Sequence, residues 1–233
     1  MILSTGRSYV FIHSPKTGGT ALALALEARA KADDIMLGDT PKARRRRHRV
    51  KDVSTAGRKW KHSSLGDIEG LVPDQTLRGL FAFTLVRNPW DRAVSYYHWL
   101  QEQSFDNPAV HLAQRLSFCD FVSHPQTMAA FRAAPAASYM RHRDGSHQCQ
   151  LYIRLEHFAI DAQPLFDHLG FELKLPLANT SSRQRDWRTY YDSSSVESVS
   201  HSCAEDIAQF EYSFNDSPLS LYSDIELLSF DGL

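Results

Sequence analysis

Residues 10–31 constrain the fold more than any other segment, because an apolar run, a glycine turn and a helix-forming stretch follow one another directly. Residues 10–12 are valine, phenylalanine and isoleucine, which predict a short buried strand. Gly18 and Gly19 permit a tight turn, and residues 21–31 consist mostly of strong helix formers. At such a junction, unpaired main-chain N–H groups and the positive end of the helix dipole face one point. The segment therefore predicts an anion site that takes a phosphate.

Lys16 narrows the kind of phosphate ligand. In the P-loop of nucleotide triphosphatases the lysine follows the last glycine, whereas Lys16 precedes both glycines. The loop is also shorter, which suits one phosphate better than a wrapped triphosphate. Taken alone, the loop leaves one alternative open, which is a Gly–Gly turn between strand and helix with a solvated lysine.

A second strand–helix junction follows later in the chain. Residues 80–86 are almost continuously apolar, as expected of a strand that is covered on both faces. Arg87 ends this run at the carboxyl end of the strand, where ligands bind in open α/β sheets, and its planar fork suits a phosphate. Asn88 then caps a helix, and Ser95 on its second turn can add a hydroxyl donor. The alternative is an Arg87 that pairs with Asp91 and a serine that is merely tolerated.

These two junctions resemble the nucleotide motifs of the sulfotransferases that use 3′-phosphoadenosine-5′-phosphosulfate (PAPS). Residues 11–20, FIHSPKTGGT, are similar to the family's 5′-phosphosulfate loop, and residues 86–97, VRNPWDRAVSYY, are similar to its 3′-phosphate motif. The likeness is closest to the carbohydrate sulfotransferase branch (sulfotransferase family 2), including its small bacterial members. Weaker similarity continues in residues 152–158, 177–183 and 206–214. The middle of the chain, roughly residues 104–150, resembles the family poorly.

The resemblance implies a three-layer, P-loop-like α/β fold with a central, mainly parallel sheet flanked by helices. It assigns the N–H groups of the glycine turn to the 5′-phosphate, and Lys16 to the oxygen between phosphate and sulfuryl group. Arg87 and Ser95 would bind the 3′-phosphate, and Arg183 or Arg185 would supply a cation from a late loop. The cofactor-binding residues implied in this way are Lys16, Thr17, Gly18, Gly19, Thr20, Arg87, Ser95, Arg183 and Arg185.

A sulfotransferase of this kind needs a general base for the acceptor hydroxyl, and histidine suits that role because its pKa is ordinarily about 6.5. We expect His62 to be this base and Lys16 to be the other catalytic residue. Family members are similar in placing a Lys–His pair at the start of a helix between the two motifs. The alternative for His62 is a surface histidine at a helix start. His13 is closer to Lys16 in sequence, but its place in a strand favours a packing role, and His98 on the second helix favours a structural one.

The implied residues predict an enzyme that moves a sulfuryl group from PAPS to a hydroxyl acceptor by in-line displacement. Charge builds on the leaving oxygen, where cations and N–H donors stabilise it. We expect no metal, because lysine and arginine already hold the leaving phosphate, and a glycan or a small molecule as acceptor. Two alternatives stay open. One is a P-loop-type kinase or NTPase, although its lysine would follow the glycines and an aspartate, not Arg87, would end a later strand. The other is a non-catalytic nucleotide-binding protein.

The length of 233 residues predicts one sulfotransferase domain, residues 1–214, with a helical acceptor-region insert at about residues 104–148. Residues 215–233 are too apolar for a free tail, so we expect them to pack on this domain or on a partner chain. A homo-oligomer is one such arrangement. The net charge of −1 favours neither nucleic acid nor a membrane surface as a partner.

The remaining composition bears on cellular context. Three scattered cysteines without metal-ligand spacing suit free thiols in a reducing compartment. We find neither a signal peptide nor an apolar run of the roughly 20 residues that span a bilayer, and therefore expect a cytoplasmic protein without a membrane anchor. Residues 42–51 form the densest basic run, with three interpretations: a flexible solvated loop, a strip that binds an anionic acceptor or glycan, or a nucleic-acid patch.

Overall fold

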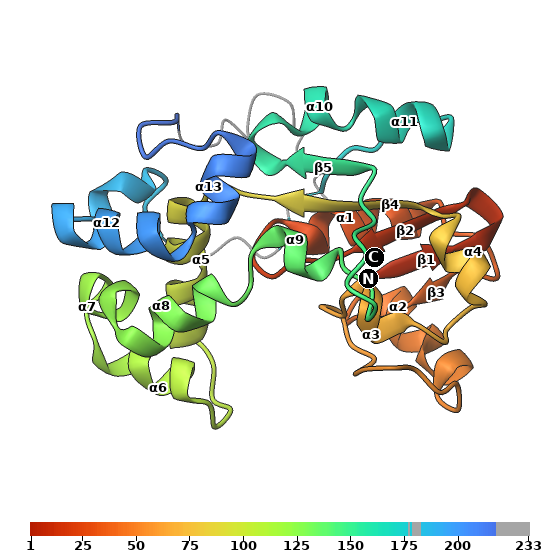
Figure 1. The fold of residues 1–233 in the computed structure, drawn as a ribbon, viewed down its shortest axis with the longest axis horizontal. Coiled ribbons are helices and arrows are strands. Elements are labelled where there is room, and N and C mark those ends of the chain that lie inside the picture. Colours follow the sequence, from red (N-terminus) through yellow and green to blue (C-terminus); the bar gives the residue numbers. More distant parts are fainter. Residues whose placement is uncertain (177, 179–182, 218–233) are drawn as a thin grey trace, which may run out of the picture.

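A computed structural model of the chain describes residues 1–176, 178 and 183–217. Its centre is a five-stranded sheet in the order β3-β1-β2-β4-β5 (Figure 1). The strands are β1 (Ile2–Ser4), β2 (Tyr9–Ile12), β3 (Ile35–Met36), β4 (Phe81–Val86) and β5 (Leu151–Arg154). β2 pairs with β4, and β4 with β5, in parallel, while β1 runs antiparallel to both of its neighbours. Four of the five strands therefore point the same way, which confirms the predicted α/β class with a mainly parallel sheet.

Helices cover both faces of the sheet and form a lobe at the carboxyl ends of β4 and β5 (Figure 1). One face carries α1 (Gly19–Ala28) and α11 (Gln163–Leu169), and the other carries α3 (Leu65–Ile68) and α4 (Asp74–Arg78). The lobe contains α5 (Pro89–Gln101), α6 (Pro108–Arg115), α7 (Phe118–Ser123), α8 (Pro125–Arg132), α12 (Ser193–Ser202) and α13 (Ala204–Phe210). The shorter elements are η1 (Thr5–Arg7), α2 (Pro41–Arg46), η2 (Arg47–Val50), α9 (Ala136–Tyr139), η3 (Leu155–His157), α10 (Phe158–Asp161) and η4 (Trp187–Tyr190).

The alternation of side chains along β2 explains the three layers. Tyr9 and Phe11 pack with α1 on one face, while Val10 and Ile12 pack with α3 and α4 on the other. All four side chains are at most 1% exposed. A strand buried on both faces must be apolar at every position, which is why this run is continuous in the sequence.

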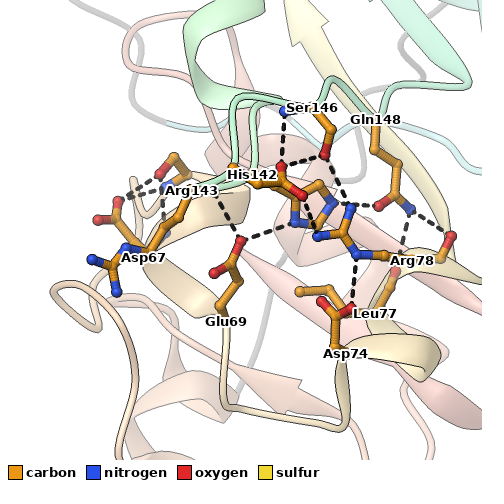
Figure 2. Close-up of polar contacts among 11 residues, drawn as sticks. Asp67, Glu69, Asp74, Leu77, Arg78, His142, Arg143, Ser146 and Gln148 are labelled. Carbon is orange, nitrogen blue, oxygen red and sulfur yellow. Dashed lines mark hydrogen bonds and ion pairs between the residues drawn. The ribbon is translucent and has the colours of Figure 1, made fainter.

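The expected helical insert contains α6, α7, α8 and α9, followed by a hairpin closed by the Arg141–His147 bridge. Figure 2 shows how this hairpin is fastened next to α3 and α4. Buried His142 faces Glu69 Oε1 with Nδ1 at 3.2 Å and Gln148 Oε1 with Nε2 at 2.7 Å. The Gln148 amide donates to three main-chain carbonyls at the end of α4 and the start of β4, at 2.9–3.2 Å. This network holds the connection to β5 against the segment that follows His62.

The basic run, residues 42–51, forms α2 and η2 and is not the flexible loop that was one of its interpretations. Several of its cations bind main-chain carbonyls in the last turn of α1 and in the segment that follows it. Lys42 Nζ donates to the Glu27 carbonyl, and Arg46 Nη1 donates to the Lys31 carbonyl at 2.7 Å. Cations at a helix C-terminus satisfy carbonyls that have no helical partner. α1 ends at Ala28, before the predicted end at residue 31.

Two negative findings hold for the part of the chain that the structure describes. No helix there has both the length and the apolar character needed to cross a bilayer. No group of three or more His, Cys, Asp and Glu side chains is arranged there for a metal ion. The three cysteines are free. Residues 177 and 179–182 of the late loop, and residues 218–233 of the expected C-terminal extension, lie outside the described residues.

Candidate active site

The loop between β2 and α1 is held in one shape by its own contacts. Lys16 and Gly18 adopt the left-handed conformation, with φ of 65° and 83°. The Thr17 hydroxyl donates to the Ser14 carbonyl at 2.9 Å. The hydroxyls of Ser14 and Thr84 lie 3.1 Å apart, which ties the loop to β4. A positive φ is costly for a residue with a side chain, so these contacts must hold the backbone of Lys16 in place.

Gly19 begins α1 at a point where the helix touches the end of β2. A Cβ at this position would lie 2.0 Å from Cδ2 of His13, which is itself 6% exposed. Only glycine permits so close an approach. The ring of His13 therefore fills the space beneath the glycine turn, which fits the packing role expected for it.

The main-chain N–H groups of residues 17–20 have no acceptor among the described residues. The next N–H along the chain, that of Ala21, donates to the Gly18 carbonyl at 3.0 Å. α1 has ten residues, and its first turn holds no acidic side chain that would offset the helix dipole. The N–H groups of this turn and the positive end of α1 are therefore available to an anion.

Asp91, on the first turn of α5, binds two arginines at once. Its Oδ2 accepts from Nε and Nη2 of Arg87 at 2.9 and 2.7 Å, and its Oδ1 accepts from Nη2 of Arg183 at 2.7 Å. The side chains of Asp91, Arg87 and Arg183 are 3%, 10% and 14% exposed. The Arg87–Asp91 pair that the sequence left open as an alternative does form. Because a second guanidinium joins it, the cluster keeps a net positive charge.

Lys16 lies beside this cluster. Arg87 Nη1 donates to the Lys16 carbonyl at 3.2 Å, so the arginine that follows β4 touches the loop that follows β2. Burial, with the charges of Arg87 and Arg183 as the next causes, lowers the pKa of Lys16 from 10.5 to about 8. Its Nζ lies 5.4 Å from the centre of the Trp99 ring. A bound anion would offset both the repulsion and the burial of the ammonium, so three cations favour a negative ligand here.

Two polar groups next to the cluster have no partner among the described residues. The hydroxyl of Ser95, a residue that is 7% exposed on α5, makes no hydrogen bond there. Nη1 of Arg183 is buried and likewise unpaired. A buried donor without a partner is costly, so Arg183 Nη1 indicates a missing acceptor, whereas the Ser95 hydroxyl is a donor that is free to bind one. Of the other expected residues, Thr20 is half-buried and Arg185 is exposed. Arg183 is thus the late-loop arginine that contacts Asp91.

His62 lies on the other flank of the loop. Its Nδ1 donates to the main-chain carbonyl of His13 at 2.8 Å. Because a carbonyl can only accept, the proton sits on Nδ1 and the lone pair on Nε2. The ring packs edge-on against the rings of His13, at 4.6 Å, and Trp60, at 5.1 Å. Burial lowers the pKa of His62 to about 4, although the hydrogen bond to His13 opposes the shift. His62 is therefore neutral at physiological pH, with Nε2 able to accept a proton.

Three contributors to this site could not be assigned from the sequence. Asp91 entered only as a competitor for Arg87, and its four-residue spacing was the one available signal. The carbonyl of His13, which orients His62, carries no side-chain signal at all. Trp99 shares a face of α5 with Ser95, but an aromatic residue there is indistinguishable in sequence from one that packs in the core.

The chain was compared with known proteins. No protein-family model matches it, and no curated protein matches it significantly. Among solved structures it is similar to the crystal structure of mouse sulfotransferase SULT7A1 complexed with PAP, the desulfated form of PAPS. The sequence identity is 16%, the match covers 94% of this chain and 75% of that one, and the TM-score is 0.34. We therefore infer the function from the residues and motifs of this chain alone.

Proposed function

We propose that this chain is a PAPS-dependent sulfotransferase that passes a sulfuryl group to a hydroxyl acceptor. The observation that carries the proposal is the 3.2 Å contact between Arg87 Nη1 and the Lys16 carbonyl. Through it the unpaired N–H groups of the glycine turn lie next to the Arg87–Asp91–Arg183 cluster. A nucleotide with separate 5′- and 3′-phosphates needs two adjacent anion sites of this kind. ATP carries its phosphates in one chain and has no 3′-phosphate for the second site.

The groups that lack partners fit such a ligand. We assign the 5′-phosphate to the N–H groups of Thr17, Gly18, Gly19 and Thr20. We assign the 3′-phosphate to Arg87, the Ser95 hydroxyl and the buried Nη1 of Arg183, whose missing acceptor it would supply. When bound, PAPS supplies the sulfuryl group together with a phosphate leaving group.

Lys16 stabilises the charge that develops as the sulfuryl group leaves. Its ammonium would lie beside the oxygen that bridges phosphate and sulfur, where negative charge grows during transfer. A pKa of about 8 already leaves most Lys16 protonated at neutral pH, and a neighbouring phosphate raises that fraction. Removing one such group costs about 10²–10³ in rate.

His62 accepts the proton of the acceptor hydroxyl. As the acceptor oxygen bonds to sulfur and the bridging sulfur–oxygen bond breaks, Nε2 takes the proton, and the Nδ1 hydrogen bond to the His13 carbonyl keeps the ring in the required tautomer. The same hydrogen bond stabilises the imidazolium that forms. Its low pKa keeps Nε2 free of a proton before the reaction.

The acceptor that we propose is a hydroxyl of a glycan or a small molecule. Trp60 favours an acceptor with a flat face, because the residue is 38% exposed and its ring lies edge-on to His62 at 5.1 Å. The Arg58 guanidinium lies over one face of the ring, 4.8 Å from its centre. Both sugar rings and aromatic rings pack on exposed aromatic side chains.

Binding and transfer test the proposal separately. Calorimetric titration should show PAP binding without magnesium, tighter than ADP and tighter than ATP with Mg²⁺. Tighter binding of ATP with Mg²⁺ would indicate a kinase or NTPase. Transfer of labelled sulfate from PAPS to glycan and small-molecule pools should fall by about 10²–10³ in Lys16→Ala and by about 10²–10⁴ in His62→Ala. Because the proposed base does not hold the nucleotide, His62→Ala should keep the PAP affinity of the unmodified protein. PAP binding without transfer to any pool would indicate a non-catalytic binder.

A further inference from the structure

His98, which the proposed mechanism does not use, has a buried ring nitrogen without a partner. Its Nε2 makes no hydrogen bond within the described residues, and the same holds for the neighbouring Nη1 of Arg183. Arg183 is joined to the helix that carries His98 by its hydrogen bond to Asp91. Buried polar atoms ordinarily have a partner, and each of these two nitrogen atoms lacks one among the described residues.

The position of His98 on α5 puts it in line with the 3′-phosphate residues. Asp91, Ser95 and His98 are spaced by four and three residues, so they form one stripe along the helix. Arg183 is fixed to this stripe by its hydrogen bond to Asp91 at 2.7 Å. The unpaired Ser95 hydroxyl lies one turn from His98, where side chains are about 5–6 Å apart at Cβ. That separation is one that a single phosphate can bridge.

Neighbouring aromatic rings hold the His98 side chain in place. Its ring packs edge-on against Tyr190 at 5.1 Å and against Tyr97 at 5.5 Å. Burial, followed by the charge of Arg183, lowers the pKa of His98, whereas Glu102 opposes the shift. Because the aromatic rings already fix the side chain, a phosphate that accepts a hydrogen bond from Nε2 would not have to order it.

We propose that His98 contacts the 3′-phosphate of the nucleotide, donating a hydrogen bond from Nε2 beside the Ser95 hydroxyl and Arg183 Nη1. The proposal rests on the proposed function and adds a residue to its nucleotide site. It makes His98 a determinant of selectivity for nucleotides that carry a 3′-phosphate over those that do not.

The test compares PAP with adenosine 5′-phosphate, which lacks the 3′-phosphate, by calorimetric titration. His98→Phe keeps a ring against Tyr190 but removes Nε2, and it should weaken PAP binding by about 10- to 100-fold without changing adenosine 5′-phosphate binding. His98→Gln places an amide N–H near the position of Nε2 and should restore most of the PAP affinity. Ser95→Ala should lower the same PAP selectivity. The matched control is His201→Phe, an exposed residue whose ring bonds only within its own helix, and it should change neither affinity.

The outcomes separate this inference from the proposed function. Equal weakening of both nucleotides in His98→Phe, or an unchanged PAP selectivity, would overturn the role of His98 while leaving the sulfotransferase proposal intact. An unmodified protein that binds PAP no more tightly than adenosine 5′-phosphate would overturn both. If His98→Phe does not fold, His98→Asn replaces it, because its shorter amide cannot reach the phosphate. Retained PAP selectivity in that variant would equally refute the contact.

Discussion

Asp91 offers a direct test of the site, because one buried carboxylate holds two arginines. Three charge-assisted hydrogen bonds of 2.7–2.9 Å depend on it. Asp91→Asn preserves the shape of the side chain and one acceptor oxygen. It removes the negative charge, however, and turns an NH₂ group toward a guanidinium donor. In this variant, the positive charges of the two buried guanidinium groups should therefore lack the negative charge that offsets them.

The expected loss of stability follows from the burial of the cluster. Breaking a buried ion pair by removing one partner costs about 3–5 kcal/mol. With side-chain exposures of 3% for Asp91, 10% for Arg87 and 14% for Arg183, the cluster belongs to that class. Because the amide still accepts one hydrogen bond, we expect the free energy of unfolding to fall by about 3 kcal/mol. At about 2–4 °C per kcal/mol for a chain of this size, Tm should fall by about 6–12 °C.

Urea and thermal unfolding, followed by circular dichroism at pH 7, measure this loss. The control is Asp39→Asn, which breaks the 2.7 Å pair with Lys61, whose two side chains are 66% and 36% exposed. Solvent screening limits such a pair to less than about 1 kcal/mol. Equal losses in the two variants, or a loss below about 1 kcal/mol in Asp91→Asn, would refute the reasoning that Asp91 holds the two cations.

Three other outcomes concern the loop and its surroundings. Gly19→Ala should lose about 1–3 kcal/mol in urea unfolding, because its Cβ would lie 2.0 Å from the His13 ring. Gly38→Ala, whose Cβ would have its nearest neighbours at 3.8 Å, should change stability by less than about 0.5 kcal/mol, and equal losses would contradict the steric account. PAP affinity, titrated from pH 7 to 10, should fall above pH 8 as Lys16 loses its proton, since the pKa of Lys16 is about 8. The PAP affinity of Lys16→Arg should not fall in this range. A PAP affinity of the unmodified protein that does not change with pH would count against a role for the Lys16 ammonium in binding. Glu156→Gln should lower the free energy of unfolding by about 1–3 kcal/mol, because the half-buried carboxylate accepts from a main-chain N–H and a tyrosine hydroxyl. An unchanged Tm would speak against that contribution.

Much of the sheet and the start of the site could be predicted from the sequence because their signals are local. The apolar runs at residues 10–12 and 80–86 correspond to β2 and β4. Asn88 caps α5 by accepting from the N–H of Trp90 at 3.1 Å. The glycine pair marks the turn between β2 and α1, where one glycine needs a positive φ and the other a missing side chain. Each of these features depends on neighbours within a few positions.

Features that depend on distant partners could not be predicted in the same way. Arg183 lies 92 positions from Asp91, so no local pattern joins them. The sequence of the basic residues 42–51 favours solvated charges, because it does not show the carbonyls of Glu27 and Lys31 that accept from Lys42 and Arg46. Side-chain type shows what a group can donate, but only the fold shows where its acceptor lies.

In the loop of residues 13–20, the main-chain carbonyls and the main-chain N–H groups have different partners. This difference explains why the site needs segments that are distant in the sequence. The carbonyl of His13 accepts from His62, 49 positions away, and the carbonyl of Lys16 accepts from Arg87, 71 positions away. The carbonyl of Ser14 accepts from Thr17 within the loop. The loop thus uses its acceptors to fix the proposed base on one flank and the proposed phosphate-binding cation on the other, while the N–H groups of residues 17–20 stay unpaired among the described residues. Because both side chains are held by main-chain groups, substitutions elsewhere in the loop that shift its backbone should disturb nucleotide binding and proton transfer together.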